Sequence, residues 1–354
     1  MLHALDCFAE NLQRDGFMID RIVGRVAAGE SLSREEMYQA IDGMMQGNWS
    51  DSQIAVFLTS LHTRGETVDE VVGAASAMRK NMTPIRSSLS GLIDTCGTGG
   101  DGSGTFNIST AAAFVVAGCD LPVAKHGNRS ITSKTGSADV LQALDICIDP
   151  PIATVEQCLE NVGICFCFAP QVHPAMKYVG PVRKRLEMPT IFNLLGPLCN
   201  PAGAPYQLLG VGKSEVRPLL AEASCKLGTE KTVMVTGCDG LDEVTLNGPT
   251  DVLVIENGQV SEIQWEPLDF GLSNHVLDSL SVKNAEESAG VIQQILDGAQ
   301  GPARDIVILN AAAALWAARV DDDLQNCAQM AAEAIDRGAA AEKVVQMREW
   351  TSHK

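Results

Sequence analysis

The chain of 354 residues has few basic side chains for its size. Lys and Arg number 26 against 44 Asp and Glu, so the formal net charge is −18. Proteins that coat nucleic acid or bind an anionic membrane carry a basic surplus, so we expect neither partner. No stretch approaches the roughly 20 consecutive apolar residues of a membrane span. The first twenty residues contain five charged ones and lack the pattern of a signal peptide.

The chain also lacks internal repeats and low-complexity linkers. Hydrophobic residues make up 45% of it, which excludes disorder for most of its length. The eleven cysteines are an odd number, and most lie in apolar segments, which predicts reduced thiols and a cytoplasmic location. Cys165 and Cys167 lie two apart on an expected strand and face the same side. Because no further ligands stand nearby in the sequence, we expect no metal site there.

Residues 1–90 are predicted to form a helical N-terminal domain. A capping box places a hydroxyl before a helix and a carboxylate or amide three residues later, and the two satisfy N–H groups at the helix start. An earlier helix is expected over residues 19–28. Glycines that suit helix ends follow two of the helices, at Gly47 and Gly65. The three capping boxes are Ser33–Glu36, Ser50–Gln53 and Thr67–Glu70.

Residues 91–354 are predicted to form a larger α/β domain with a central, mostly parallel sheet. Short apolar runs alternate there with helical patterns, as in sheets covered by helices. Part of the proline-rich segment 170–205 is expected to join the helical domain. The expected strands are 93–94, 121–124, 164–168, 207–211, 233–235 and 252–255, and the expected helices are 108–118, 137–144, 154–162, 214–227, 284–297 and 326–336.

The glycine-rich segment 94–110 is the strongest local motif. It follows an expected strand, has five glycines within eight residues and leads into an apolar helix. Glycines allow positive φ, so that backbone N–H groups can converge on an anion near the positive end of the helix. We interpret the segment as a phosphate cradle. Gly97, Gly99 and Gly102 also match the dinucleotide pattern G-x-G-x-x-G, but the helix begins too late for that fold.

Two further loops carry charges suited to a phosphorylated ligand. Segment 125–137 follows a strand and contains Lys125, Arg129 and Lys134, which can oppose phosphate oxygens. Segment 239–243 ends in the adjacent acids Asp242 and Glu243, which repel each other unless a cation such as Mg²⁺ lies between them. The fourth feature, Arg183 among apolar residues, suits a small aromatic carboxylate.

These motifs together resemble the anthranilate phosphoribosyltransferase family, in order and spacing, across about residues 91–244. The resemblance implies a homodimer with a helical and an α/β domain that acts in tryptophan biosynthesis. It implies a Mg²⁺-dependent transfer of the phosphoribosyl group of phosphoribosyl pyrophosphate to the amine of anthranilate. Some positions depart from the family: Glu187-Met188-Pro189 stands where a glycine and a basic residue are frequent.

The resemblance also implies roles for individual residues. Lys125 and Arg183 are expected to be catalytic, the first by stabilising the leaving pyrophosphate and the second by fixing the anthranilate carboxylate. Mg²⁺ is assigned to Ser109, Asp242 and Glu243. Anthranilate is assigned to Gly97, Asn128 and Arg183, with His126, His173 and Pro197 along its path. Phosphoribosyl pyrophosphate is assigned to Gly97, Gly100, Asp101, Thr105, Asn107, Ile108, Ser109, Thr110, Lys125, His126, Gly127, Asn128, Arg129, Ser130, Ile131, Thr132, Ser133 and Ser137.

Three other readings remain open from the sequence. A pyrimidine nucleoside phosphorylase shares the architecture but attacks the ribose with inorganic phosphate, which a phosphorolysis assay detects. A non-catalytic relative of the same fold that binds nucleic acid is disfavoured by the charge of −18. A nicotinamide-dependent dehydrogenase rests only on the weak glycine pattern, and failure to bind the dinucleotide would exclude it.

Overall fold

The computed structural model describes residues 19–129, 136–276 and 280–352. The chain divides into two compact units. The helical unit contains the residues up to Met82 together with His173–Cys199, and the α/β unit contains Thr83–Val172 and Asn200–Lys354. In the described ranges, no helix is both long and apolar enough to cross a lipid bilayer.

The helical unit begins with a helix over 19–27. All three predicted capping boxes are present: each hydroxyl accepts a hydrogen bond from the N–H three residues on, and the carboxylate or amide accepts from the cap N–H. Gly65, with φ of 89°, ends its helix as predicted. The remaining elements of this unit are α2 (Arg34–Met45), α3 (Asp51–Arg64), α4 (Val68–Asn81), α9 (Gly180–Leu186), α10 (Phe192–Leu195) and two 3₁₀ turns, Pro174–Tyr178 and Gly196–Leu198.

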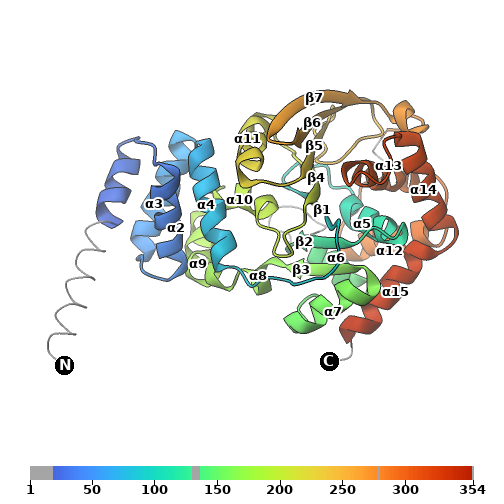
Figure 1. The fold of residues 1–354 in the computed structure, drawn as a ribbon, viewed down its shortest axis with the longest axis horizontal. Helices are drawn as coiled ribbons and strands as arrows, with labels where there is room; N and C mark the ends of the chain where they lie inside the picture. The colour runs from blue at the N-terminus through green and yellow to red at the C-terminus, as the bar shows by residue number, and fades with distance from the viewer. Residues whose placement is uncertain (1–18, 130–135, 277–279, 353–354) are drawn as a thin grey trace. The chain divides into compact units, whose positions relative to one another are not determined.

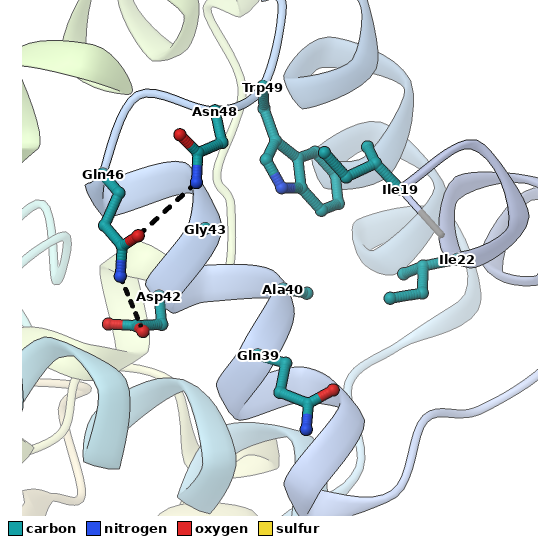
Figure 2. Close-up of a pocket in the computed structure, with 9 residues that line it drawn as sticks. All are labelled: Ile19, Ile22, Gln39, Ala40, Asp42, Gly43, Gln46, Asn48 and Trp49. Carbon is teal, nitrogen blue, oxygen red and sulfur yellow. Dashed lines mark hydrogen bonds between the residues drawn. The ribbon is translucent and has the colours of Figure 1, made fainter. Parts of the chain in front are cut away.

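A pocket of about 260 Å³ opens on the helical unit (Figure 2). One wall is the indole of Trp49, which packs edge-on against Phe57 with ring centroids 5.2 Å apart. On another side the Gln46 amide donates a hydrogen bond of 2.9 Å to Asp42. None of the residues assigned to substrate or metal lines this pocket. Its lining consists of Ile19, Ile22, Gln39, Ala40, Asp42, Gly43, Gln46, Asn48 and Trp49.

The α/β unit is built on a seven-stranded sheet, in which the strands lie in the order β3-β2-β1-β4-β5-β6-β7 (Figure 1). The first five in sequence are parallel, and β6 and β7 are antiparallel. The predicted fold class is therefore confirmed. The strands are β1 (Ile93–Gly97), β2 (Val123–Gly127), β3 (Ile164–Phe168), β4 (Tyr206–Gly210), β5 (Lys231–Gly237), β6 (Thr250–Glu256) and β7 (Gln259–Trp265).

Helices cover both faces of this sheet. Side chains alternate between the faces along a strand, so Ile164 and Phe166 of β3 enter the larger core while Cys165 enters a smaller one on the other face. Figure 1 shows α5 and α13 on one side of the sheet and α11 on the other. The helices are α5 (Ile108–Gly118), α6 (Ser137–Ala143), α7 (Ile152–Val162), α8 (Ala169–Val172), α11 (Arg217–Leu227), α12 (Ala285–Leu296), α13 (Pro302–Ala317), α14 (Leu324–Asp336) and α15 (Ala339–Ser352), with 3₁₀ turns at Ser214–Val216 and Pro267–Phe270.

The structure differs from the sequence prediction in several elements. The expected helix 214–227 is a 3₁₀ turn followed by α11, in which Pro218, with no N–H, stands at the helix start. The expected strands are present, but most are longer than predicted or shifted by one or two residues. Strand β7 and helices α13 and α15 were not predicted.

Candidate functional site

The glycine loop follows β1 at the carboxyl edge of the parallel strands. Because β1, β2, β4 and β5 run in the same direction, the loops that follow them meet at this edge, where ligands of open α/β sheets bind. The loop has no regular structure between β1 and α5. Four of its glycines have left-handed φ values of 67° to 81°, a conformation that residues with a Cβ rarely adopt. They are Gly99, Gly100, Gly102 and Gly104.

Helix α5 begins where this loop ends. The Asn107 side chain caps it by accepting a hydrogen bond of 3.0 Å from the Thr110 N–H. Just before the cap, the Phe106 N–H donates to the carbonyl of Leu280 at 3.0 Å. Phe106 is 1% exposed and therefore anchors the loop to the core. The N-terminus of α5 lies at the carboxyl edge of the sheet, where the positive end of a helix can bind an anion.

The acidic segment after β5 contacts the glycine loop. Asp242 Oδ2 accepts a hydrogen bond of 2.9 Å from the Gly99 N–H. Glu243 accepts a hydrogen bond from the Ser109 N–H at the start of α5. Burial and the Asp101 carboxylate raise the pKa of Asp242 to about 7, and burial and Asp242 raise the pKa of Glu243 to about 8. Without a cation, these two acids therefore retain protons to a higher pH than ordinary carboxyl groups do.

The donor set at this segment suits a hard divalent cation. Asp242 and Glu243 are adjacent in the chain, and Glu243 accepts a hydrogen bond from the N–H of Ser109, whose hydroxyl is a further oxygen donor. Burial, and after it the neighbouring carboxylates, raise the pKa of both acids, and a cation would offset this clustered negative charge. In the part of the chain that the structure describes, no three His, Cys, Asp or Glu side chains gather closely enough to enclose a metal ion. Two carboxylates and a hydroxyl fit a Mg²⁺ ion that completes its shell with phosphate oxygens and water.

Lys125 lies beside this donor set. It is 4% exposed on β2, and its Nζ donates to the Thr95 carbonyl and, at 3.2 Å, to the Ser109 hydroxyl. Burial lowers the pKa of Lys125, while the carboxylates of Asp94 and Glu243 oppose that effect. One continuous chain of contacts thus joins five residues of this site: Gly99, Asp242, Glu243, Ser109 and Lys125.

The segment after β2 carries the remaining predicted residues of this unit. His126 is 7% exposed, and its backbone N–H donates to Asp94 Oδ1 at 3.0 Å. Arg129 forms an ion pair of 2.9 Å with Asp139. Gly127 leaves no room for a side chain, because a Cβ there would lie 2.3 Å from Ser137 Oγ. Asn128 and Ser137 are joined by a hydrogen bond of 3.3 Å. Ser130, Ile131, Thr132, Ser133 and Lys134 lie outside the described residues.

Arg183 lies in the helical unit, on α9. Its Nη2 donates to Asn193 Oδ1 at 3.3 Å, and its guanidinium lies 5.3 Å from the centroid of the Phe192 ring. Burial lowers the pKa of Arg183. His173 and Pro197, in the same unit, are both buried in turns of the backbone. A guanidinium that packs on the Phe192 ring suits an aromatic carboxylate.

Two buried polar residues outside the predicted set also contact the site. Asp94 is fully buried on β1 and accepts from the N–H of His126, and burial raises its pKa. Asn310 is fully buried on α13 and bonds to the backbone of Val244, next to Glu243. The only signal in the sequence is a polar residue within an apolar run, which does not reveal the partner.

Comparison with known proteins identifies the family. Residues 89–341 match the family model described as glycosyl transferase family, a/b domain, and residues 21–82 match that described as glycosyl transferase family, helical bundle domain. An anthranilate phosphoribosyltransferase of Moorella thermoacetica is 46% identical over 94% of this chain and 98% of its own length. The chain belongs to the anthranilate phosphoribosyltransferase family. A further member, from Petrotoga mobilis, is 42% identical over 95% of this chain and 97% of its own.

Solved structures of anthranilate phosphoribosyltransferases agree with this family. The protein from Thermus thermophilus has a TM-score of 0.87 and 37% identity, covering 93% of this chain and 99% of its own. The protein from Saccharomyces cerevisiae, solved in complex with phosphoribosyl pyrophosphate and Mg, has a TM-score of 0.86 and 28% identity, covering 95% and 98%. The family inferred from the sequence motifs is thus confirmed, while the individual residue roles stay predictions.

Proposed function

We propose that this chain transfers the phosphoribosyl group of phosphoribosyl pyrophosphate to the amine of anthranilate, giving N-(5-phosphoribosyl)anthranilate and pyrophosphate, in tryptophan biosynthesis. The observation that carries the proposal is the contact chain at the sheet edge. There the left-handed glycine loop, the start of α5, Lys125 and the acidic pair are joined by hydrogen bonds. One diphosphate sugar can engage all of these groups at once.

Different residues of the site are assigned to phosphoribosyl pyrophosphate and to the metal ion. In this proposal, the glycine loop, the first turn of α5 and the segment from Lys125 to Ser137 bind phosphoribosyl pyrophosphate. Ser109, Asp242 and Glu243 hold Mg²⁺, which when bound neutralises charge on the pyrophosphate oxygens. Binding the ion requires both carboxyl groups to lose the protons that their raised pKa values favour.

The reaction needs charge stabilisation more than a base. The amine lone pair forms the new bond to C1 of the ribose as the C1–O bond breaks. Pyrophosphate leaves with the electron pair of the broken C1–O bond. Backbone N–H groups of the loop and the Lys125 ammonium stabilise the departing negative charge. The aromatic amine is already neutral, so its surplus proton can pass to solvent after attack. Holding the two substrates in the correct orientation then supplies much of the rate.

Arg183 is assigned to the carboxylate of anthranilate. Phe192 and Asn193 hold its guanidinium in place, and an apolar surrounding strengthens a pair between guanidinium and carboxylate. We expect Arg183→Ala to raise the KM for anthranilate at least tenfold and to leave the KM for phosphoribosyl pyrophosphate within about twofold. Lys184→Ala, an exposed neighbour on α9, is the matched control and should change neither value. Unchanged kinetics in Arg183→Ala would exclude the role.

A fluorescence assay tests the function itself. The chain is mixed with anthranilate, and the loss of anthranilate is followed with and without phosphoribosyl pyrophosphate and Mg²⁺. Consumption should require both. If anthranilate is not consumed, but a nucleoside is cleaved with inorganic phosphate, the chain is a phosphorylase and the proposal is wrong.

The proposal includes the setting of the enzyme. We place it in the cytoplasm as a homodimer, with a helical domain of residues 1–90, joined by part of 170–205, and an α/β domain of residues 91–354. These statements rest on the family resemblance and, for the location, on the unpaired cysteines among the described residues. Sedimentation velocity should give about twice the mass of 37.6 kDa, and a monomer at micromolar concentration would refute the dimer.

A further inference from the structure

Helix α13 carries one polar residue within a fully buried stretch. Residues 306–315 are all buried, and Asn310 is the single residue among them that is not hydrophobic. Asn310 is 0% exposed. Burying an amide costs free energy unless each of its polar atoms is hydrogen-bonded. The neighbouring alanines of α13 show that an apolar residue would suit the helix equally well, so the amide needs another explanation.

The amide of Asn310 holds both backbone groups of Val244. Its Oδ1 accepts from the Val244 N–H at 2.9 Å, and its Nδ2 donates to the Val244 carbonyl at 2.9 Å. The second hydrogen of Nδ2 goes to the Ile306 carbonyl, also at 2.9 Å. Val244 directly follows Glu243, so this pair of bonds fixes the backbone at the end of the acidic segment.

The same segment also packs closely against a glycine. Gly210, the last residue of β4, pairs in register with Gly97 of β1. A Cβ on Gly210 would lie 1.6 Å from the carbonyl oxygen of Asp242 and 2.5 Å from its carbonyl carbon. A Cβ at residue 210 could therefore be accommodated only if the loop that contains Asp242 moved. The backbone of residues 242–244 is therefore restrained at Asp242 by contact with Gly210 and at Val244 by hydrogen bonds to the Asn310 amide.

We propose that Asn310 is a positioning residue for the metal-binding acids. It acts through Val244 and fixes the direction in which Asp242 and Glu243 present their carboxylates. The loss of a group that orients metal ligands typically weakens metal affinity about 10-fold to 100-fold. The proposal rests on the proposed function for the assignment of the metal to Asp242 and Glu243.

Direct metal binding tests the proposal. Mn²⁺, which electron paramagnetic resonance detects, is titrated into the full chain with phosphoribosyl pyrophosphate and without anthranilate, so that no turnover occurs. Asn310→Leu keeps the number and branching of the side-chain heavy atoms and removes both hydrogen bonds to Val244. We expect the Kd for Mn²⁺ to rise about 10-fold to 100-fold.

Two further variants separate positioning from loss of stability. Leu315→Ala removes a fully buried side chain from the same helix without touching Val244, and we expect it to lower stability and to keep the Kd for Mn²⁺ within about twofold. Asn310→Ser places a small polar residue at the site, and the Kd for Mn²⁺ is measured in this variant if Asn310→Leu does not fold. Amide hydrogen exchange at Val244 should be faster in Asn310→Ser than in the wild-type chain.

The outcomes distinguish the two proposals. A folded Asn310 variant with unchanged Mn²⁺ affinity overturns the role of Asn310, and so does an equal loss of affinity in Leu315→Ala. Neither result depends on whether anthranilate is consumed. A wild-type chain that binds Mn²⁺ with phosphoribosyl pyrophosphate but consumes no anthranilate refutes the proposed function and leaves the role of Asn310 intact.

Discussion

Glu187 has a backbone conformation that favours glycine. It caps the end of α9 with φ of 50° and ψ of 29°, in the left-handed region. The segment Glu187–Pro189 is also where the resemblance to the family leads us to expect a glycine. A left-handed residue with a Cβ costs roughly 1–2 kcal/mol, and the larger entropy of an unfolded glycine offsets part of that.

We therefore expect Glu187→Gly to stabilise the protein. The free energy of unfolding should rise by about 0.5–1 kcal/mol, measured by urea titration. Glu187→Ala keeps the Cβ and serves as the control, with no comparable gain. Equal stability of the two variants would show that the backbone conformation at this position carries no strain.

The sequence indicates the functional side chains but not the groups that hold them. Asp242 and Glu243 are found because adjacent acids on a loop are unfavourable without a cation. Gly210 and Asn310 act on the same loop from positions about 30 and 65 residues away in the chain, and only the fold brings them together. Arg183 is similar, because its contact with Phe192 depends on how α9 and α10 pack.

Among the secondary-structure elements, those marked by a local sequence signal are predicted best. The three capping boxes use residues three apart, so the sequence contains the whole interaction. Helix α13 was missed because residues 306–315 are buried on every side and show no polar face. Strand β7 was missed for the opposite reason: its residues before Trp265 are all exposed, and no apolar alternation marks it.

The capping boxes predict a stability effect for each helix. In α2, Ser33 Oγ accepts from the Glu36 N–H, and its loss leaves that donor unpaired. Ser33→Ala should lower the free energy of unfolding by about 1 kcal/mol in chemical denaturation. Ser31→Ala, two residues earlier and also exposed, should change it by less than about 0.5 kcal/mol. An equal effect of both substitutions would contradict the capping role.

For the whole molecule, the acidic pair links stability to pH and to metal. The folded-state pKa values of Asp242 and Glu243, about 7 and about 8, lie above those of ordinary carboxyl groups. Between about pH 4.5 and pH 8, the folded state holds protons that the unfolded chain has lost. The metal-free protein therefore loses stability from this pair as pH rises through that range.

Added Mg²⁺ should reverse this trend. It competes with the two protons, so its stabilising effect grows as pH rises. We expect the rise in Tm on adding Mg²⁺ to metal-free protein to be larger at pH 8.5 than at pH 6. The double variant Asp242→Asn, Glu243→Gln should show no such difference. If wild-type protein gains the same Tm increment at both pH values, the pair does not control metal binding.

The confinement of Asp242 against Gly210 has a consequence for how such a protein diverges. One added methyl group at the end of β4 collides with the acidic loop, at 1.6 Å from a carbonyl oxygen. If Asp242 and Glu243 hold Mg²⁺ as proposed, a descendant with alanine at this position can keep its sheet and helices and lose the metal site. One methyl group at residue 210 would then be enough to separate the fold of the protein from its proposed metal binding.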